Sequence, residues 1–126
     1  MKDMMVGMGI TNEPPLLAWV FRDETAVKKR KEIKAFLDAS FAAKKILLDD
    51  DEIWLTLREK MGAADNDGLF TTLRDDYRAG ILREYNDDTT AAAAASFAIM
   101  AEVGGSELVG DSSVMDPGTF WSGYRT

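Results

Sequence analysis

The sequence contains neither cysteine nor histidine among its 126 residues. The absence of cysteine excludes disulfide bonds and thiolate nucleophiles, and it removes the usual indicator of redox compartment. The absence of histidine removes the most common general base and the most common transition-metal ligand. Serine nucleophiles that rely on lysine are not indicated either, because no S-x-x-K motif occurs. We therefore expect no catalytic residue, no bound metal and no cofactor.

Long hydrophobic runs are also absent. No uninterrupted segment approaches the roughly 20 apolar residues that cross a bilayer. The first ten residues are too short for a signal peptide and carry one lysine and one aspartate. The sequence therefore predicts a soluble protein without a membrane span. If the protein is exported, the export signal lies outside these residues.

Positive charge is scarce and concentrated in one segment. The net charge is −7, and an acidic chain repels phosphate backbones, so we expect no nucleic-acid partner. Residues 25–48 are the exception, with seven Lys/Arg against two acidic residues, a balance of +5. Lys28, Lys29 and Lys31 are candidate contacts for an acidic partner. The alternative, common for such runs, is a solvated helix face.

Apolar spacing in the first half predicts helices. Thr25 is a candidate cap for a helix over residues 26–47. One face of this helix carries apolar or small side chains at helical spacing and is expected to be buried: Ile33, Phe36, Leu37, Ser40, Phe41 and Leu48. The acidic run Asp49–Asp51 is typical of a helix start. A second stripe follows and ends at Gly62: Ile53, Trp54, Leu57 and Met61.

The second half repeats these signals. Residues 65–67 are expected to open a third helix that turns Leu69, Phe70, Leu73, Tyr77 and Ile81 inward. Residues 86–89 supply caps for a fourth helix at 91–103, rich in alanine, that ends at Gly104 and Gly105. The predicted fold is mainly α, an irregular bundle of four to five helices in a single domain, 1–126. It comprises an extended lead-in (1–24), helices (25–104) and a loop-rich tail (105–126) tethered by Phe120, Trp121 and Tyr124.

Two short motifs suggest ligands only weakly. Gly7-Met8-Gly9 partly matches a phosphate-binding glycine pattern, but Asn12 stands where a glycine is required and no strand clearly precedes it. A simple turn is the better interpretation. Residues 65–68 resemble the start of a calcium loop, but Gly68 and Leu69 occupy the wrong positions. Helix capping is the better interpretation there.

The apolar segment after Pro14 and Pro15 is the most interesting candidate for ligand binding. Residues 16–21 read LLAWVF, and their β-favouring side chains predict an extended conformation. Our candidate ligand-binding residues are Leu17, Trp19, Phe21 and Tyr77. Core packing is the alternative for the aromatic residues of this segment, as it is for Trp54 and Trp121.

Five blocks of the sequence resemble the nitrate/sulfonate/taurine-type periplasmic substrate-binding proteins of ABC transporters. The similarity extends over nearly the whole chain and rests on the order and spacing of the blocks. They are PPLLAWVFRDETA (14–26), AFLDASFAAKKILL (35–48), DDDEIWLTLREKM (49–61), LRDDYRAGI (73–81), and GGSELVG (104–110) followed by DPGTFW (116–121).

This resemblance implies the helical C-terminal portion of a transporter receptor. Members of the family have two α/β lobes and bind their ligand between them, whereas this chain matches only the part that follows the strand-rich first half. The resemblance implies a small anionic or organic solute as ligand, a periplasmic location, and a permease as partner only within a full receptor. Outside the family, a cytoplasmic location is expected. The alternative functions are a homodimeric interaction or regulatory module and a small-ligand binder with a pocket between helices or subunits.

Overall fold

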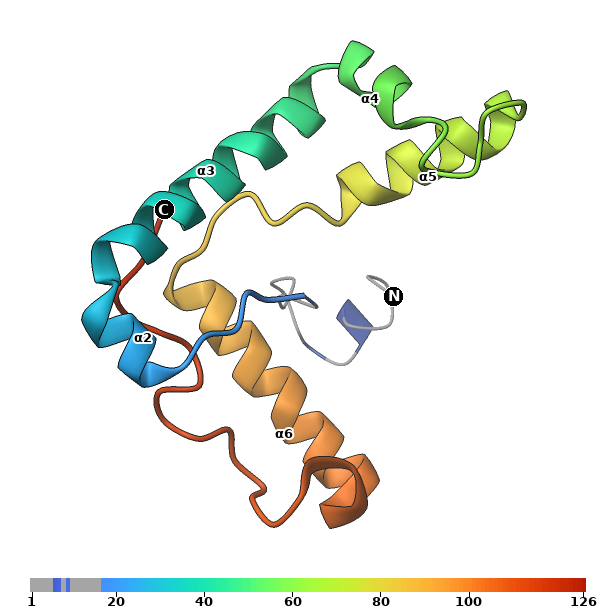
Figure 1. Ribbon diagram of the computed structural model, residues 1–126. Helices are drawn as coiled ribbons and strands as arrows, with labels where there is room; N and C mark the ends of the chain where they lie inside the picture. Colours follow the sequence, from blue (N-terminus) through green and yellow to red (C-terminus); the bar gives the residue numbers. More distant parts are fainter. Residues whose placement is uncertain (1–5, 8, 10–16) are drawn as a thin grey trace. The chain divides into compact units, whose positions relative to one another are not determined.

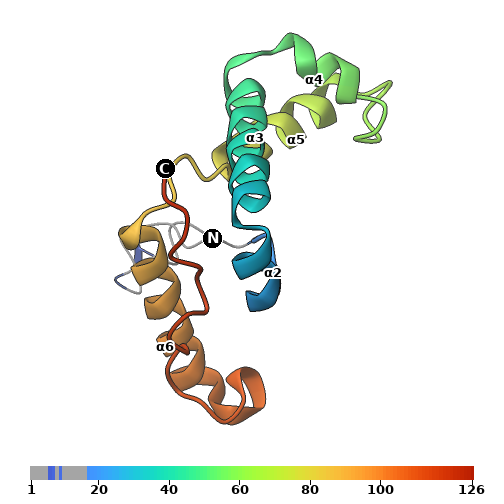
Figure 2. The same ribbon diagram turned by 60° about the vertical axis from the view of Figure 1, so that its left-hand side comes forward.

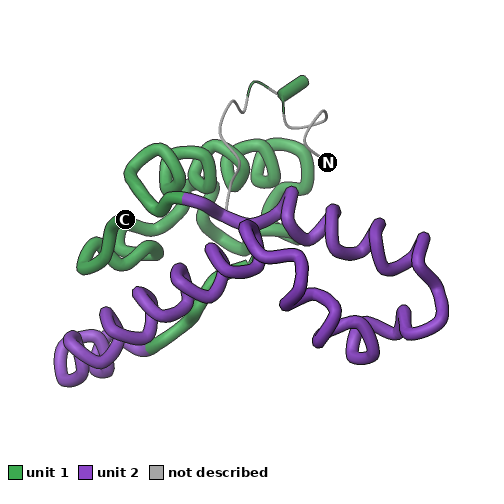
Figure 3. The backbone as a smooth tube through the Cα atoms, turned by 90° about the horizontal axis from the view of Figure 1, so that it is seen from above, with its two compact units in different colours: residues 1–21, 84–126 green, residues 22–83 purple. Residues whose placement is uncertain are grey.

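The structure is a computed structural model that describes residues 6, 7, 9 and 17–126 (Figure 1). These residues are 62% helical and include no β-strand, which confirms the mainly α class. The helices are α2 (Asp23–Lys28), α3 (Arg30–Asp49), α4 (Glu52–Leu57), α5 (Asp67–Ala79) and α6 (Asp87–Val109). The chain divides into two compact units, with residues 1–21 and 84–126 in unit 1 and residues 22–83 in unit 2 (Figure 3).

In unit 2, α2 and α3 replace the single helix predicted for residues 26–47. The break lies at Lys29, whose backbone leaves the helical region at φ −124° and ψ 36°. Thr25 lies inside α2, so its predicted capping role is wrong. Arg22 occupies the N-cap position without a side-chain cap bond. Neither glycine nor proline marks the break, which is why the apolar spacing predicted one continuous helix.

The predicted buried face of α3 is only partly covered. Most of its residues are half-buried, but Phe36 is 49% exposed, so its expected burial is wrong. Within unit 2, α3 packs against the short helices α2 and α4, which adjoin its two ends. These short neighbours leave part of the length of α3 open.

The core of unit 2 forms around α4. The carboxylate of Asp50 accepts hydrogen bonds from the backbone N–H groups of Glu52 (2.8 Å) and Ile53 (3.3 Å), as the predicted acidic helix start requires. Trp54 is buried with Ala63 and Phe70. Leu47 packs against this cluster, and so do the other three members of the predicted stripe, Ile53, Leu57 and Met61, which are partly buried. Core packing, the alternative interpretation of Trp54, is therefore confirmed.

Helix α5 begins as predicted but faces the core differently. Asn66 caps it by accepting a hydrogen bond from the backbone N–H of Leu69 (2.8 Å). Phe70 and Ile81 are buried, but Leu69, Leu73 and Tyr77 are exposed, so their predicted inward position is wrong. The guanidinium groups of Arg74 and Arg78 lie over the rings of Phe70 and Trp54 instead.

In unit 1, α6 begins with the predicted cap. The Asn86 side chain accepts from the Thr89 N–H (3.1 Å), and the Thr89 hydroxyl accepts from the Asn86 N–H (3.3 Å), which together form a capping box. The helix does not end at Gly105, where the sequence predicted its end. It is kinked there, with a φ of +60° that favours glycine, and continues to Val109.

The tail after α6 returns along this helix toward its N-terminal end (Figures 1 and 2). Trp121 meets Phe21 edge to face, with ring centroids 5.3 Å apart. Phe120 and Tyr124 each lie 6.5 Å from the ring of Tyr85. The predicted tethering of the tail by its aromatic residues is therefore confirmed within unit 1.

The lead-in to α2 is irregular. Residues 18–22 form no regular element, and Leu17 and Val20 are more than 90% exposed, so a buried strand is excluded for this stretch. The prediction for Leu16 lies outside the described residues, as does that for Met8. Gly9 lies in a turn, where its N–H donates to the carbonyl of Val6 (3.0 Å).

Candidate functional site

Several side-chain hydrogen bonds meet at the C-terminal end of α3. The carbonyl oxygen of Leu47 accepts hydrogen bonds from Trp54 Nε1 and from Arg78 Nε, each at 2.8 Å. Arg78 also donates to the carbonyl of Asp50 (3.1 Å), and its Nη1 lies 2.6 Å from the carboxylate of Asp51. The last carbonyl groups of a helix lack partners within the helix. Trp54 and Arg78 supply donors there and join α3, α4 and α5.

The charges of this cluster are fixed at neutral pH. The hydrogen bond from Arg78, together with its positive charge, lowers the pKa of the Asp51 carboxyl below its ordinary value. A hydrogen bond to Asp75 raises the pKa of the Arg74 guanidinium. Neither group exchanges a proton near neutral pH, which does not fit general acid–base catalysis. The arrangement is structural.

Tyr77, a predicted ligand-binding residue, lies beside this cluster. Its ring meets that of Trp54 nearly edge to face, with centroids 5.5 Å apart and an interplanar angle of 69°. Tyr77 remains 54% exposed. One side of the ring therefore packs on the core, and the other is accessible to a partner.

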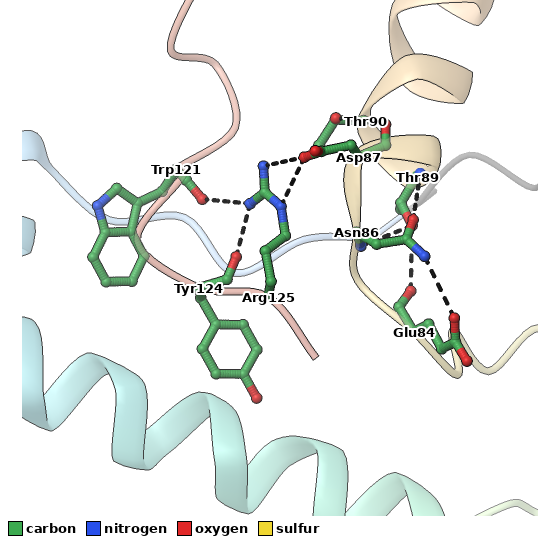
Figure 4. Close-up of polar contacts among 8 residues, drawn as sticks. All are labelled: Glu84, Asn86, Asp87, Thr89, Thr90, Trp121, Tyr124 and Arg125. Carbon is green, nitrogen blue, oxygen red and sulfur yellow. Dashed lines mark hydrogen bonds and ion pairs between the residues drawn. The ribbon is translucent and has the colours of Figure 1, made fainter.

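In unit 1, Arg125 closes the tail onto the first turn of α6 (Figure 4). Its Nε and Nη2 donate to the carboxylate of Asp87 at 3.1 and 3.0 Å. Its Nη1 donates to the carbonyl groups of Trp121 (3.3 Å) and Tyr124 (2.7 Å). One guanidinium therefore links a helix N-terminus, where negative charge is favoured, to the chain that returns to it.

Tyr85 also bonds the tail, and we call the contacts that Arg125 and Tyr85 make with each other, with the tail and with Asp87 the tail clamp. Its N–H donates to the Thr126 hydroxyl (2.7 Å), and its carbonyl accepts from the Thr126 N–H (3.1 Å). The Arg125 guanidinium lies 5.0 Å from the centre of the Tyr85 ring. Burial raises the pKa of the Tyr85 hydroxyl above its ordinary value. The ring therefore stays neutral and serves as a packing platform.

The other predicted ligand-binding residues belong to unit 1, whereas Tyr77 belongs to unit 2. Leu17 is 93% exposed and Trp19 is 59% exposed. Phe21 is half-buried against Trp121. The four predicted residues thus do not share one compact unit, and their role in ligand binding stays a prediction.

The three predicted partner-binding lysines lie on the surface of unit 2. Lys28 ends α2 and pairs with Glu24 one turn earlier. Lys29 lies at the break, and Lys31 lies in the first turn of α3. All three are exposed. An exposed pair such as Lys28–Glu24 contributes only about 0.3–0.5 kcal/mol, so it hardly restrains the lysine from meeting another charge.

The acidic motif at residues 65–68 stabilises the start of a helix. Asn66 caps α5, which is the role that we preferred to calcium binding for residues 65–68. Arg58 bonds both the carbonyl of Ala63 and the carboxylate of Asp67, which closes the loop before α5. Within the described part of the chain, no group of three or more Asp and Glu residues is arranged to hold a metal ion.

Among the described helices, α6 has a length and composition compatible with crossing a membrane. Only 6% of its most apolar window is buried. The sequence prediction of no span considered uninterrupted apolar runs, whereas this window is apolar on average and includes charged or polar positions. Length and composition alone are weak evidence, because helices of soluble proteins also meet this test.

The tail clamp bears directly on this possibility. The part of α6 before its kink at Gly105 extends over roughly 27 Å, and the irregular tail returns from the far end of the helix to Asp87. Irregular backbone does not lie exposed within the hydrocarbon layer, because its polar groups would lack partners. Helix α6 can therefore cross a bilayer only if the contact between Arg125 and Asp87 is broken.

Comparison with protein-family models, curated proteins and solved structures finds no match to this chain. The resemblance to substrate-binding proteins therefore rests on the five sequence blocks alone.

The main structural residues missed by sequence reasoning are Arg78 and Arg125. Arg74 and Arg78 follow Phe70 at intervals of four, which places all three on one helix face. That spacing was the available signal for Arg78. The partner of Arg125 is Asp87, 38 positions away, and no local pattern connects them.

Proposed function

We propose that this chain is a non-catalytic interaction module that acts as a homodimer. The proposal is carried by exposed apolar side chains in both units. Val27 on α2 is 81% exposed, and Val103 on α6 is 83% exposed. Further large apolar side chains are exposed on the helices: Phe36, Ile46, Leu55, Met100 and Leu108. Extensive exposed apolar surface on a small protein favours association with another chain.

The chemistry of the chain supports binding rather than catalysis. The arginine clusters described above bond helix ends and tail carbonyl groups. The sequence offers no histidine or cysteine for general-base or thiolate chemistry. A closed two-fold dimer is the commonest way for one chain to cover its own apolar surface.

Sedimentation equilibrium of the purified chain tests this proposal. We expect the mass of a dimer at high concentration and dissociation on dilution. Thermal unfolding should shift to higher temperature as protein concentration rises, because association stabilises the folded state. A strictly monomeric mass at all concentrations, with a constant melting temperature, would contradict the proposal.

The resemblance to periplasmic receptors supports a second candidate, the binding of a small anionic or organic solute. Its support is the five sequence blocks, together with the exposed aromatic side chains of Trp19 and Tyr77. A periplasmic location, and a permease as partner within a full receptor, belong to this candidate.

Thermal unfolding with nitrate, taurine and an aliphatic sulfonate tests the second candidate. A solute that binds the folded chain raises its melting temperature. We expect Trp19→Ala to abolish the rise in melting temperature, and Leu55→Ala, which removes an exposed side chain outside the predicted site, to preserve it. No rise with any of the three solutes would count against this candidate.

A further inference from the structure

Helix α6 is apolar on all sides along much of its length. Its residues 89–101 carry no charge and include the run Ala91–Ala95, followed by Phe97, Ile99 and Met100. Apolar residues that follow one another directly surround a helix, whereas spaced ones form a single face. Only 6% of the most apolar window of α6 is buried. A helix of this kind is expected either inside a protein core or across a membrane.

The two kinds of helix in soluble proteins that resemble a membrane span do not fit α6. A core helix of this composition would be mostly buried, and α6 is not. A signal sequence lies near the start of its chain, and 86 residues precede α6. A lipid bilayer covers a helix on every side, whereas a second copy of this chain would cover one face. The bilayer therefore fits the pattern of α6 best.

The charges of α6 determine when it fits a bilayer. All four are carboxylates, with Asp87 and Asp88 at its start and Glu102 and Glu107 near its end. While Glu102 is charged, the uncharged stretch 89–101 extends over about 20 Å, which is shorter than the hydrocarbon layer of about 30 Å. Once Glu102 is neutral, 18 uncharged residues precede Glu107 and extend over about 27 Å. That length lies within the range of membrane-spanning helices.

Acid neutralises Glu102 without breaking an ion pair. Glu102 is exposed, and no ion pair among the described residues involves it. Residues 17–21 of unit 1 carry no titratable side chain, and those of the tail are Asp111, Asp116, Tyr124 and Arg125. Arg125 pairs with Asp87 at the other end of the helix. Acid removes the charge of Asp87 as well, which loosens the tail clamp, and transfer out of water favours a neutral carboxyl group.

We propose that α6 crosses a lipid bilayer at acidic pH, once Glu102 is neutral and the tail clamp has opened. At neutral pH, the charge of Glu102 and the bond between Arg125 and Asp87 keep α6 at the surface of unit 1. The bilayer needs no anionic headgroups, because α6 carries no Lys or Arg that they would attract. This inference goes beyond the proposed homodimer and does not depend on it.

A fluorescent label on α6 tests the insertion. The chain has no cysteine, so Ala95→Cys takes a single environment-sensitive label at an exposed position within the uncharged stretch. The probe is phosphatidylcholine vesicles with and without brominated acyl chains. In acid, we expect the emission to shift to shorter wavelength and to lose intensity to the brominated chains. At neutral pH neither change should occur. A label at Leu55→Cys, on exposed α4, is the control and should stay unquenched.

A paired comparison at neutral pH separates insertion from association caused by acid. The sequence pI is about 4.5, so acid also removes the net charge that keeps chains apart. Glu102→Gln combined with Arg125→Ala removes the blocking charge and the clamp together, and the labelled helix should then insert at neutral pH. Glu107→Gln combined with Arg125→Ala is the matched control. It should not insert, because Glu102 remains charged.

A label in the tail distinguishes a helix that crosses from one that lies in the interface. Ser113→Cys is exposed in the tail, which moves to the far side of the vesicle when α6 crosses. A membrane-impermeant thiol reagent added outside should then lose access to it.

Three results would overturn the inference: no quenching at Ala95 in acid or in the Glu102 variant, equal insertion of the Glu107 variant, or quenching at Ala95 while Ser113→Cys stays accessible. A chain that dimerises in solution but never enters vesicles would overturn this inference and leave the homodimer standing. A chain that inserts but is strictly monomeric in solution would do the reverse.

Discussion

Each of the two units is stabilised internally by a different kind of contact. Unit 2 buries the large side chains Trp54 and Phe70 and uses Arg78 to occupy the carbonyl groups at the end of α3. Among the described residues of unit 1, the buried ones are Thr89 and Ala92 of α6 and Tyr124 of the tail. Unit 2 therefore depends on a packed core, whereas unit 1 depends on a tail that is bonded along a helix.

Because of this difference, we expect substitutions in the two units to lower stability by different amounts. Removing a large buried side chain leaves a cavity, and the cost grows with the volume left empty. Removing an exposed ion pair leaves both groups solvated, and the cost is small. Substitutions in unit 2 should consequently affect stability more than substitutions in the tail of unit 1.

The largest expected effect comes from the core of unit 2. Phe70→Ala should lower the free energy of unfolding by about 3–5 kcal/mol, because it removes a buried ring. Chemical denaturation followed by circular dichroism measures the change. Leu55→Ala, at an exposed position in α4, is the control and should change stability little. Equal effects of the two substitutions would show that unit 2 lacks the packed core described here.

The next effect comes from Arg78. Arg78→Ala should cost about 2–3 kcal/mol, because it removes charged hydrogen bonds to the carbonyl groups of Leu47 and Asp50 and leaves Leu47 with Trp54 as its side-chain donor. Arg78→Lys keeps the positive charge but not the planar set of donors, so it should recover only part of the loss. Arg83→Ala, an exposed arginine just after α5, should be close to neutral. Full recovery by lysine would show that charge alone explains the role of Arg78.

These two predictions also separate what the sequence could reveal from what it could not. The capping roles of Asp50, Asn66 and Asn86 could be predicted from the sequence, because a capping side chain bonds a backbone N–H only two or three residues away. Trp54 was found because the spacing of its stripe is helical. The mainly α class followed from the same local signals.

The remaining features depend on tertiary packing. Leu73 and Tyr77 follow helical spacing, but Arg74 and Arg78 occupy the face that covers the core rings. A guanidinium packs on an aromatic ring through its planar face, which a division into apolar and polar residues does not anticipate. The contact between Arg125 and Asp87 spans 38 positions and is likewise beyond local patterns.

A smaller effect is expected in the tail of unit 1. Arg125→Ala should cost less than about 1 kcal/mol, because the carboxylate of Asp87 is largely exposed. Hydrogen exchange should nevertheless quicken at Tyr85 and in the first turn of α6, where the tail is bonded. Exchange in α5 of unit 2 should not change. Faster exchange throughout both units would contradict a local role for the clamp.

The smallest effect concerns pH. The pKa of Asp51 is lowered in the folded chain, so its contribution to stability is present above the ordinary pKa of the carboxyl. This contribution is lost as pH falls through the lowered value, because the folded state then binds the proton that the unfolded state has already bound. Asp51→Asn should remove this part of the acid sensitivity, measured by thermal unfolding across acidic pH. Glu59→Gln, at an exposed residue after α4, should retain it.

The carbonyl oxygen of Leu47 receives two side-chain donors, from Trp54 and Arg78, and both bonds are 2.8 Å long. Two strong hydrogen bonds weaken the C=O stretch and move its infrared absorption to lower frequency. A ¹³C label at this one carbonyl would therefore give unit 2 a vibrational signal of its own. The band should return toward the ordinary helical frequency as soon as α5 separates from α3, even while both helices remain folded.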